Sequence, residues 1–275
     1  MIETGQELKC PCRSGNQKLM FTYHEPPVGE IKFKFSSSNK YERKITRCGT
    51  CGHFLSKHDM DMSQLYSDDY VNSTYGQDGI IKAFNRINSL DPKKSDNVGR
   101  VDRILRFADT HFQEKADKPS VLDVGSGLCV FLNRIKLAGW NCVALDPDQR
   151  ATKHAEEVVG IKAVCGDFLT VDKLEKYDVI TFNKVLEHVR EPIVFLEKAM
   201  EHLNMGGFIY LELPDGEGAS KEGYGREEFF IDHHHIFSSA SLCILATQAG
   251  LTVKELETLK EPSTKYTLRS FLVKN

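Results

Sequence analysis

The chain has 275 residues, a length that allows one or two domains at roughly 150 residues each. Its 36 Lys and Arg against 39 Asp and Glu give a net charge of −3, and 40% of its residues are hydrophobic. This composition excludes a disordered chain and argues against a nucleic-acid binder, which usually carries a strong basic bias. Because no apolar run approaches a membrane span of roughly 18 residues and the acidic N-terminus lacks the apolar segment of a signal peptide, we expect a cytoplasmic protein without a membrane partner.

The chain divides into three predicted regions. Residues 1–60 carry paired cysteines and β-like runs such as 31–35, with a hairpin tip at 36–39. Residues 61–118 are polar, rich in tyrosine and helical in pattern, and we expect a helical connector or lid. Residues 119–275 alternate apolar runs with amphipathic segments.

The third region predicts a parallel sheet covered by helices on both faces. Strands are expected at 120–124, 140–145, 161–164, 177–182 and 208–213, and helices at 128–138, 149–159, 192–203 and 239–249. Segments 251–259 and 266–273 are predicted as edge strands. Between them and the sheet lies a long insertion, 214–240, and long insertions in compact domains are usually functional or mobile.

The end of the first strand predicts a cofactor site, because open parallel sheets bind ligands beyond the carboxyl ends of their strands. The turn Gly125-Ser126-Gly127 would let a ligand approach the backbone closely. Asp146 ends the next strand 21 residues after Gly125, where a carboxylate accepts hydrogen bonds from ribose hydroxyls. A dinucleotide fingerprint would need glycine at Val130, and Asp123 suits an ammonium group better than a pyrophosphate, so a dehydrogenase is disfavoured.

The third strand is followed by Gly166-Asp167-Phe168. There a carboxylate can accept a hydrogen bond from an adenine amino group while an aromatic ring packs on the base, although Asp167 alone is also a common helix cap. S-adenosylmethionine combines adenine, ribose, an ammonium group and a carboxylate, and it has no phosphate. These features favour S-adenosylmethionine as the cofactor.

Four ordered runs, 121–127, 144–147, 166–168 and 177–189, together resemble the class I S-adenosylmethionine-dependent methyltransferases over about residues 119–215. The resemblance implies an α/β, Rossmann-like fold with a mostly parallel seven-stranded sheet. It implies that the glycine turn lines the methionine part, Asp146 binds ribose, Asp167 and Phe168 frame adenine, and two residues after the fourth strand flank the cofactor. The implied cofactor-binding set is Asp123, Gly125, Ser126, Gly127, Asp146, Pro147, Asp167, Phe168, Asn183 and Leu186.

Two cysteine pairs, Cys10-Pro-Cys12 and Cys48-Gly-Thr-Cys51, are separated by 35 residues. Four thiolates from two facing turns suit a tetrahedral structural zinc, which has no open position for catalysis. The first pair is tighter than the common spacing, so His24, His53 or His58 could replace Cys12, and four buried free thiols are the alternative. A reducing compartment disfavours a disulfide, and Cys129, Cys142, Cys165 and Cys243 are expected as small buried apolar residues.

A zinc-binding module before a class I domain is similar to bacterial methyltransferases acting on nucleotide-linked sugars, other surface-glycan precursors and natural products. The Tyr-rich segment 65–70 and the His- and aromatic-rich segment 227–238 carry this resemblance. The sugar C-methyltransferases of that group have a further C-terminal domain, whereas this chain ends soon after the sheet. We therefore expect an O-methyltransferase with a different acceptor.

A hydroxyl acceptor must lose a proton, and histidine suits that task near neutral pH. The candidates are His188, His233 and His235, of which the last two would share one face of an extended segment while His234 faces away. Asp232 or Glu187 would orient the base. The same histidines could instead bind a catalytic metal together with a carboxylate, or they could only anchor the loop through hydrogen bonds. Separately, Tyr70 and Tyr75 could close over the cofactor.

We expect O-methylation of a small molecule, such as a sugar, nucleotide-linked or surface-glycan precursor in polysaccharide biosynthesis. C- or N-methylation of a natural product is an alternative. Methylation of RNA or protein bound by the zinc module is another alternative. Between Lys9 and Cys51 this module has nine Lys and Arg but only three Asp and Glu. A non-catalytic S-adenosylmethionine-binding protein is a further alternative, and the sequence leaves the oligomeric state open.

Overall fold

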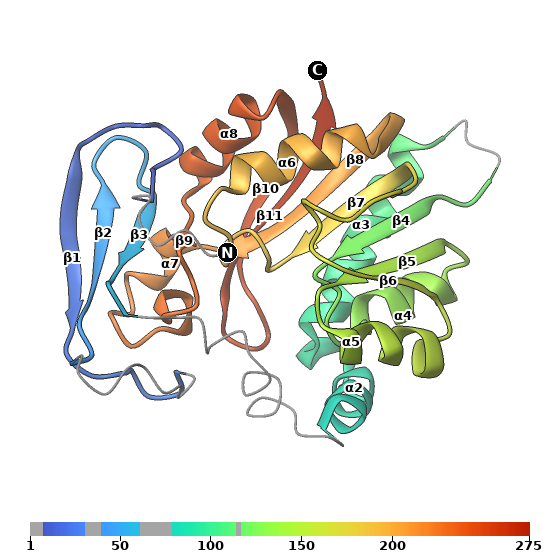
Figure 1. Ribbon diagram of the computed structural model, residues 1–275, viewed down its shortest axis with the longest axis horizontal. Coiled ribbons are helices and arrows are strands. Elements are labelled where there is room, and N and C mark those ends of the chain that lie inside the picture. The colour runs from blue at the N-terminus through green and yellow to red at the C-terminus, as the bar shows by residue number, and fades with distance from the viewer. Residues whose placement is uncertain (1–7, 31–39, 61–78, 114–116) are drawn as a thin grey trace.

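The computed structural model describes residues 8–30, 40–60, 79–113 and 117–275, which form two sheets and their covering helices (Figure 1). The predicted strand at 31–35, the hairpin tip at 36–39 and the tyrosines of segment 65–75 lie outside the described residues. The larger sheet has seven strands and the smaller sheet has four.

The seven-stranded sheet has the order β10-β11-β8-β7-β4-β5-β6. Its first five strands along the chain, β4 to β8, run parallel to one another, while β11 is antiparallel to both β8 and β10. This confirms the predicted Rossmann-like fold with a mostly parallel seven-stranded sheet. The strands are β4 (Ser120–Val124), β5 (Asn141–Asp146), β6 (Lys162–Cys165), β7 (Tyr177–Asn183), β8 (Leu203–Pro214), β10 (Leu251–Lys260) and β11 (Tyr266–Lys274).

Two expectations about this sheet are wrong. Segment 266–273 was expected at an edge, but β11 lies between β8 and β10 and is buried along most of its length. Strand β8 begins at Leu203 rather than Phe208, because Gly206 and Gly207 do not turn the chain out of the sheet. The pairing with β7 instead shifts register there, between Tyr177 and Val179.

Helices cover both faces of the large sheet, as predicted. One apolar core packs α6 (Pro192–Glu201) and α8 (Ser239–Gln248) against the sheet. The second core packs α3 (Asp96–His111) and α4 (Val130–Leu137) against the opposite face, together with α2 (Gly79–Asn88). The helix expected at 149–159 is α5 (Gln149–His154) followed by a π-helical turn (Ala155–Val159), which ends at Gly160 with φ +68°.

The small sheet is an antiparallel module, and its fourth strand comes from the insertion. Its strands β1 (Gln17–Tyr23), β2 (Arg43–Cys48) and β3 (Phe54–Lys57) come from the N-terminal region, and β9 (His235–Ile236) pairs with β3. The insertion also contains α7 (Gly216–Ala219) and a 3-10 turn (Glu227–Phe229), and its apolar residues share one core with β1, β2 and β3. The insertion therefore joins the module to the catalytic sheet, as the left half of Figure 1 shows.

The four unclustered cysteines do not all fit the expectation that they are buried. Cys129 and Cys142 are buried in the second core, whereas Cys165 is exposed and Cys243 is half-buried. Cys165 ends β6, an edge strand whose residues are half-buried or exposed, so an apolar run did not guarantee burial there. Within the described ranges, no helix is long and apolar enough to cross a membrane.

Candidate active site

The polar residues predicted to bind the cofactor lie at one edge of the large sheet. Strands β6, β5, β4 and β7 are adjacent and parallel, so their carboxyl ends reach the same edge. Asp146 and Asn183 are the last residues of β5 and β7, and Asp123 is the penultimate residue of β4. The fold thus brings together side chains separated by up to 60 residues.

Asp123 is a buried carboxylate held by two donors from β7. Its Oδ1 accepts a 2.6 Å hydrogen bond from the Thr181 hydroxyl and a 2.8 Å bond from Nδ2 of Asn183. Burial raises the pKa of Asp123 to about 6, although both donors act in the opposite direction. Within the described part of the chain, Thr181 and Asn183 are the side-chain partners of Asp123 and neither is a cation, so the carboxylate is suited to receive a cationic group.

The glycine turn after β4 is open to a ligand. Gly125 and Gly127 have φ of +69° and +47°, a region that side chains rarely adopt. A Cβ on Gly125 would come within 2.8 Å of Val185, so this position also has no space for a side chain. The buried hydroxyl of Ser126 has no hydrogen-bond partner within the described part of the chain, and such a group is available to a bound molecule.

Asp146 connects this turn to the end of β5. Its Oδ2 accepts a 2.8 Å bond from the Gly127 amide and its Oδ1 a 2.9 Å bond from the Asp148 amide. Burial raises the pKa of Asp146, while these two amides act to lower it. Each carboxylate oxygen has a second lone pair, so the fixed carboxylate can still accept from two neighbouring hydroxyls.

The other residues of the expected cofactor-binding set differ in their exposure. Phe168 and Leu186 are 2% and 0% exposed and belong to the core under α6 and α8, so their side chains are packing residues there. Asp167 is exposed and its Oδ1 accepts a 2.7 Å bond from the Leu169 amide, in a segment whose residues 168–170 form a turn rather than a helix. Pro147 is exposed at the rim after β5.

A carboxylate and two histidines form a cluster beside the end of β7. One ligand atom from each of Glu187, His188 and His233 lies within 4.8 Å of the others, and the two imidazole rings meet edge to face at 4.9 Å. Nδ1 of His188 lies 2.9 Å from the Asp232 carbonyl and Nδ1 of His233 lies 2.8 Å from the Glu228 carbonyl. A carbonyl only accepts, so both Nδ1 atoms carry the proton, which leaves each Nε2 with a free lone pair when the ring is neutral.

The carboxylates of this cluster are suited to balance a positive charge. Glu187 is 1% exposed and its Oε2 has no hydrogen-bond partner among the described residues. Oδ2 of Asp232 lies 3.7 Å from Nδ1 of His188. Burial acts to raise the pKa of Asp232, but His233 and His188 outweigh it and lower the pKa. The three groups of the cluster could therefore share either a proton or a metal ion.

His233 and His235 do not share one face of an extended segment. His233 lies in a turn, where its amide bonds to the Phe230 carbonyl, and strand geometry begins only at His235. His235 is 1% exposed, and both ring nitrogens are engaged, with His53 at 3.0 Å and the Arg190 carbonyl at 3.1 Å. Burial lowers the pKa of His235 to about 4, so its position does not suit a base that meets an acceptor.

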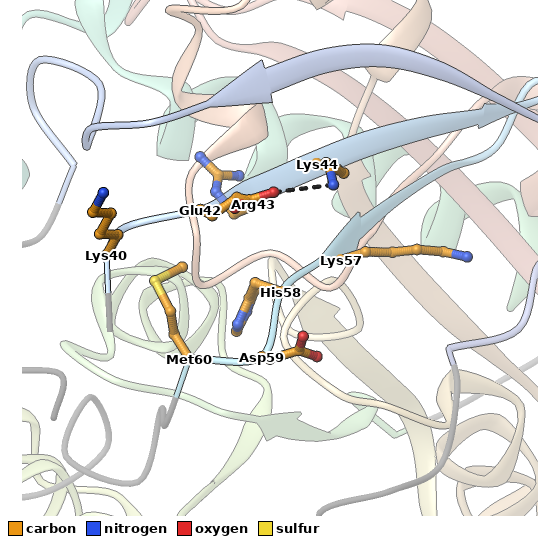
Figure 2. A pocket seen from close by; sticks show the side chains of 8 residues that line it. All are labelled: Lys40, Glu42, Arg43, Lys44, Lys57, His58, Asp59 and Met60. Atoms are coloured by element: carbon orange, nitrogen blue, oxygen red, sulfur yellow. Dashed lines mark ion pairs between the residues drawn. The ribbon is translucent and has the colours of Figure 1, made fainter. Parts of the chain in front are cut away.

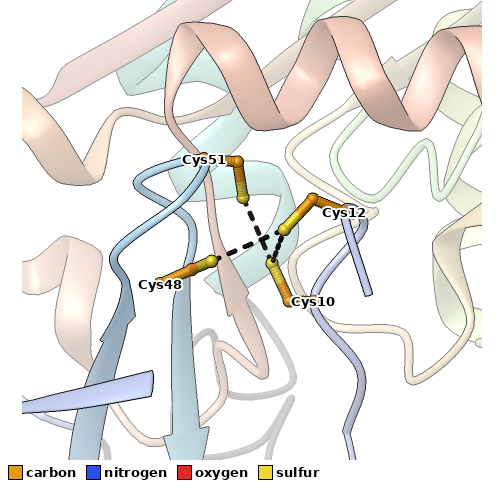
Figure 3. Close-up of side chains that lie close together, drawn as sticks. All are labelled: Cys10, Cys12, Cys48 and Cys51. Atoms are coloured by element: carbon orange, nitrogen blue, oxygen red, sulfur yellow. Dashed lines mark hydrogen bonds between the residues drawn. The ribbon is translucent and has the colours of Figure 1, made fainter. Parts of the chain in front are cut away.

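The four clustered cysteines converge on one point (Figure 3). Sγ of Cys10 lies 3.3 Å from that of Cys12 and 3.2 Å from that of Cys51, and Sγ of Cys12 lies 3.5 Å from that of Cys48. Zinc bound tetrahedrally at about 2.3 Å would hold sulfurs about 3.8 Å apart, so a small expansion fits the ion. Burial raises the pKa of Cys51 to about 11 and also raises that of Cys10, whereas the amides of Cys51 and Thr50 outweigh burial at Cys48 and lower its pKa to about 6. The thiols therefore differ in how readily they form the thiolate that metals bind.

A pocket of about 440 Å³ lies in the small module where β2 begins and β3 ends (Figure 2). Two of its basic side chains are paired, Lys44 with Glu42 and Arg43 with the buried Glu30, both at 3.0 Å. The basic excess of the N-terminal sequence is therefore partly neutralised here. The lining residues are Lys40, Glu42, Arg43, Lys44, Lys57, His58, Asp59 and Met60.

Two residues of the site were missed or misassigned from the sequence. Thr181 was not predicted, although it lies two residues before Asn183 and therefore on the same face of β7, a signal that strand periodicity offered. His53 was considered only as a substitute metal ligand, yet its ring contacts Ser241 and His235. Its position after the second cysteine pair gave no indication of that contact.

Comparison with known proteins identifies the family. Residues 97–256, more than half of the chain, match a family model described as a methyltransferase domain. Over 125 residues the chain is 32% identical to a ubiquinone biosynthesis O-methyltransferase of Actinobacillus pleuropneumoniae, covering 42% of this chain and 51% of that protein. A protein of the same name from Hydrogenovibrio crunogenus is 24% identical over 222 residues, covering 73% of this chain and 85% of that protein. The chain thus spans about half the length of the first of these relatives.

Solved structures agree on the fold. The magnesium protoporphyrin IX methyltransferase of Synechocystis, crystallised with bound S-adenosylhomocysteine (SAH), superposes with a TM-score of 0.55 at 15% identity and covers 75% of this chain and 97% of that one. A glycopeptide N-methyltransferase gives 0.51 at 14% identity, over 66% of this chain and 91% of that one. At such identities the likeness concerns the fold alone. Together with the family match, this fold identifies the chain as a member of the methyltransferase domain family.

Proposed function

We propose that the chain methylates a hydroxyl group of a small molecule, with a sugar, nucleotide-linked or surface-glycan precursor as the acceptor. The observation that carries this proposal is the pair of imidazoles whose Nδ1 atoms are committed to carbonyls at 2.9 and 2.8 Å. Each Nε2 is then free to accept the acceptor's proton, which a hydroxyl must lose during transfer. The names of the curated relatives, ubiquinone biosynthesis O-methyltransferases, support oxygen over carbon or nitrogen as the methylated atom.

Residues at the strand ends would hold S-adenosylmethionine, which when bound supplies a methyl group already activated as a sulfonium. In this proposal Asp123 receives its ammonium group, the Gly125–Gly127 turn lines its methionine part, and Asp146 accepts from its ribose hydroxyls. The support is threefold: among the described residues the buried carboxylate has no salt bridge and the Ser126 hydroxyl has no hydrogen-bond partner, and both glycines have positive φ. Holding acceptor and donor in line supplies much of the rate in such a displacement.

Proton transfer is assigned to His233 or His188, with Glu187 stabilising the imidazolium that forms. Glu187 is buried and its Oε2 is unpartnered in the described chain, so a neighbouring positive charge would satisfy it. The cluster could instead hold a divalent ion that lowers the pKa of the acceptor hydroxyl. The two possibilities differ in one measurable respect, since transfer by a base survives removal of divalent ions from the cluster.

The base is tested by single-turnover transfer of a tritiated methyl group from S-adenosylmethionine to a panel of catechols and nucleotide-linked sugars. His233→Ala and His188→Ala should bind SAH as the wild type does, while the better base loses about 10²–10⁴-fold in rate. His202→Ala is the control, because its Nδ1 also faces a carbonyl, that of Glu175, but it lies at the amino end of β7. Full rates in both test variants would contradict the assignment.

We also propose that the four cysteines bind a structural zinc, and that the chain works in a reducing compartment that keeps the thiols free. The support is the convergence of their four sulfurs within 4.8 Å of one another, from two turns of the small module. Four thiolates leave no open coordination position, so the ion would stabilise the module and would not meet the acceptor.

A further inference from the structure

A chain of buried side chains connects the cysteine turn to the loops that carry the histidine cluster. Nδ1 of His53 lies 3.1 Å from the Ser241 hydroxyl, Nε2 of His53 lies 3.0 Å from Nδ1 of His235, and Nε2 of His235 lies 3.1 Å from the Arg190 carbonyl. Ser241, His53 and His235 are each at most 1% exposed. We call Ser241, His53 and His235 the histidine relay.

The last acceptor fixes the direction of the hydrogen bond between the two histidine rings. The Arg190 carbonyl can only accept, so Nε2 of His235 carries a proton. In a neutral ring Nδ1 then accepts, so Nε2 of His53 must donate to it, and Nδ1 of His53 is left as an acceptor facing the Ser241 hydroxyl. Both rings are neutral in this arrangement, which suits groups buried away from water, and the single Ser241 proton serves either Nδ1 of His53 or the Ser238 carbonyl, each 3.1 Å away.

The relay ends where the candidate catalytic loops meet. Arg190 follows His188 by two residues, and the amides of His234 and His235 both donate to the Glu187 carbonyl, at 2.7 and 3.2 Å. The backbone of β9 and the loop after β7 are therefore clamped at two points, one through amides and one through the His235 ring. This clamp sets the place at which His233 meets His188 and Glu187.

The relay begins directly after the turn that carries Cys48 and Cys51. The Cys48 amide donates to the His53 carbonyl at 2.7 Å and the Gly52 amide to the Cys48 carbonyl at 3.0 Å, which closes the turn directly before His53. The Ser238 hydroxyl donates to the Cys51 carbonyl, so the first turn of α8 is tied to the same turn. The small module is thereby connected to the loop of His188 through side chains as well as through the β3–β9 pairing.

We propose that His53 is a positioning residue for methyl transfer, acting through His235 to hold the loops of His188 and His233 in register. The N-terminal module would then serve catalysis by completing the scaffold of the active site, in addition to any contact with an acceptor. This inference rests on the proposed role of the His188–His233 cluster in proton transfer.

The test uses the full chain with its metal and SAH bound, and it needs no acceptor. His53→Asn places an amide near Nδ1 and keeps the Ser241 contact but does not reach His235, whereas His53→Gln reaches the position of Nε2. Ser56→Ala is the control, because this buried residue of β3 has a hydroxyl without a partner among the described residues. We expect the His234 and His235 amides to exchange about tenfold faster or more in His53→Asn, and close to wild type in His53→Gln and Ser56→Ala.

A second readout separates positioning from general stability. Nitrogen-15 spectra should find the wild-type rings of His188 and His233 protonated at Nδ1, and this tautomer should be lost in His53→Asn and recovered in His53→Gln. His235→Gln keeps the Arg190 contact but breaks the bond to His53, so it should match His53→Asn, and the double variant should be no worse than either.

Two results would overturn the proposal. The first is a His53→Asn protein whose amide exchange rates and histidine tautomers match those of the wild type. The second is a double variant in which the effects of the two substitutions add, which would make His53 and His235 independent. If His53→Asn does not fold, wild-type exchange and tautomers in His235→Gln overturn the proposal in its place. A failure of the proposed function is distinct, since it would appear as absent SAH binding or absent transfer in the wild type.

Discussion

Asp123 illustrates how a single residue can serve binding at the expense of stability. The carboxylate is buried, accepts two hydrogen bonds from β7 and has a pKa raised to about 6 by burial. A raised pKa means that folding disfavours the charged form. The contribution of Asp123 to stability is therefore present below its unfolded pKa of about 3.9 and lost as the pH rises through about 6.

Asp123→Asn should therefore stabilise the unliganded protein and weaken cofactor binding. The amide oxygen can still accept from Thr181 and Asn183, while the buried charge is removed. We expect the free energy of unfolding at pH 8 to rise by about 1–3 kcal/mol, and the gain to vanish below about pH 4. Urea unfolding at both pH values measures this, and SAH affinity should fall at least tenfold at pH 8. A variant that is less stable at pH 8 and binds SAH normally would contradict this account of Asp123.

The sequence predicted the backbone positions of the site better than the directions of its side chains. Asp123, Asp146 and Asn183 follow from their places at strand ends, because that place alone brings them to one edge. Phe168 and Leu186 also follow strands, yet both are packed in the core. Which way a side chain points after a strand depends on the turn that follows, and single-sequence patterns do not determine that turn.

At the scale of elements, α3 is tied to β8 by a buried charge network. Arg100 of α3 donates through Nε to Glu212 at 2.8 Å and also through Nη2, while Arg269 of β11 lies 3.4 Å from the same carboxylate. Burial acts to raise the pKa of Glu212, but the cationic groups led by Arg100 outweigh it and lower the pKa to about 2. Its stabilising contribution is therefore present above the ordinary glutamate range and lost as the pH falls from about 4.5 towards 2.

Removing Arg100 should leave a buried carboxylate with less compensation. We expect Arg100→Met to lower the free energy of unfolding by about 3 kcal/mol at pH 7, and to move the acid-unfolding midpoint towards neutral pH. In a Glu212→Gln background the same change should cost much less, because no buried charge remains to be compensated. Equal losses in the two backgrounds, measured by urea unfolding, would show that the pair is not coupled.

The elements that the sequence could not predict are those formed by distant partners. Strand β9 has two residues, and it is a strand only because β3, about 180 residues earlier, supplies its hydrogen bonds. The sequence predicted β11 as an edge strand, yet it lies between β8 and β10. By contrast, β4 to β7 were predicted nearly to the residue, since their periodicity is local.

At the scale of the whole molecule, the insertion 214–240 packs the small N-terminal module against the large sheet. Phe229, Ile231 and Ile236 of the insertion share a core with Ile45 and Phe54 of the module. Helix α8 also contacts the cysteine turns, because Ile244 packs on the cluster and the Gln248 side chain donates to the Pro11 carbonyl at 2.7 Å. Loss of the metal site should therefore lower the stability of the large sheet as well as that of the small one.

Metal analysis and thermal unfolding test this connection. The wild type should carry one zinc ion per chain, and Cys48→Ser should lose it and lower Tm by about 5–10 °C, because a structural site contributes folding energy directly. Cys165→Ser is the matched control, since that cysteine is exposed at the edge strand outside the cluster. Zinc retained in full by Cys48→Ser would refute the assignment of the cluster.

The placement of the cofactor at the ends of β4 and β5 is the central claim, and calorimetric titration with SAH tests it most directly. The wild type should bind SAH and not NAD, and Asp146→Ala should lose at least tenfold in affinity, since its carboxylate is proposed to meet the ribose. Asp148→Ala should bind normally, because that neighbouring carboxylate caps α5 through the Arg150 amide. Unchanged SAH affinity in Asp146→Ala would contradict the placement of the cofactor site.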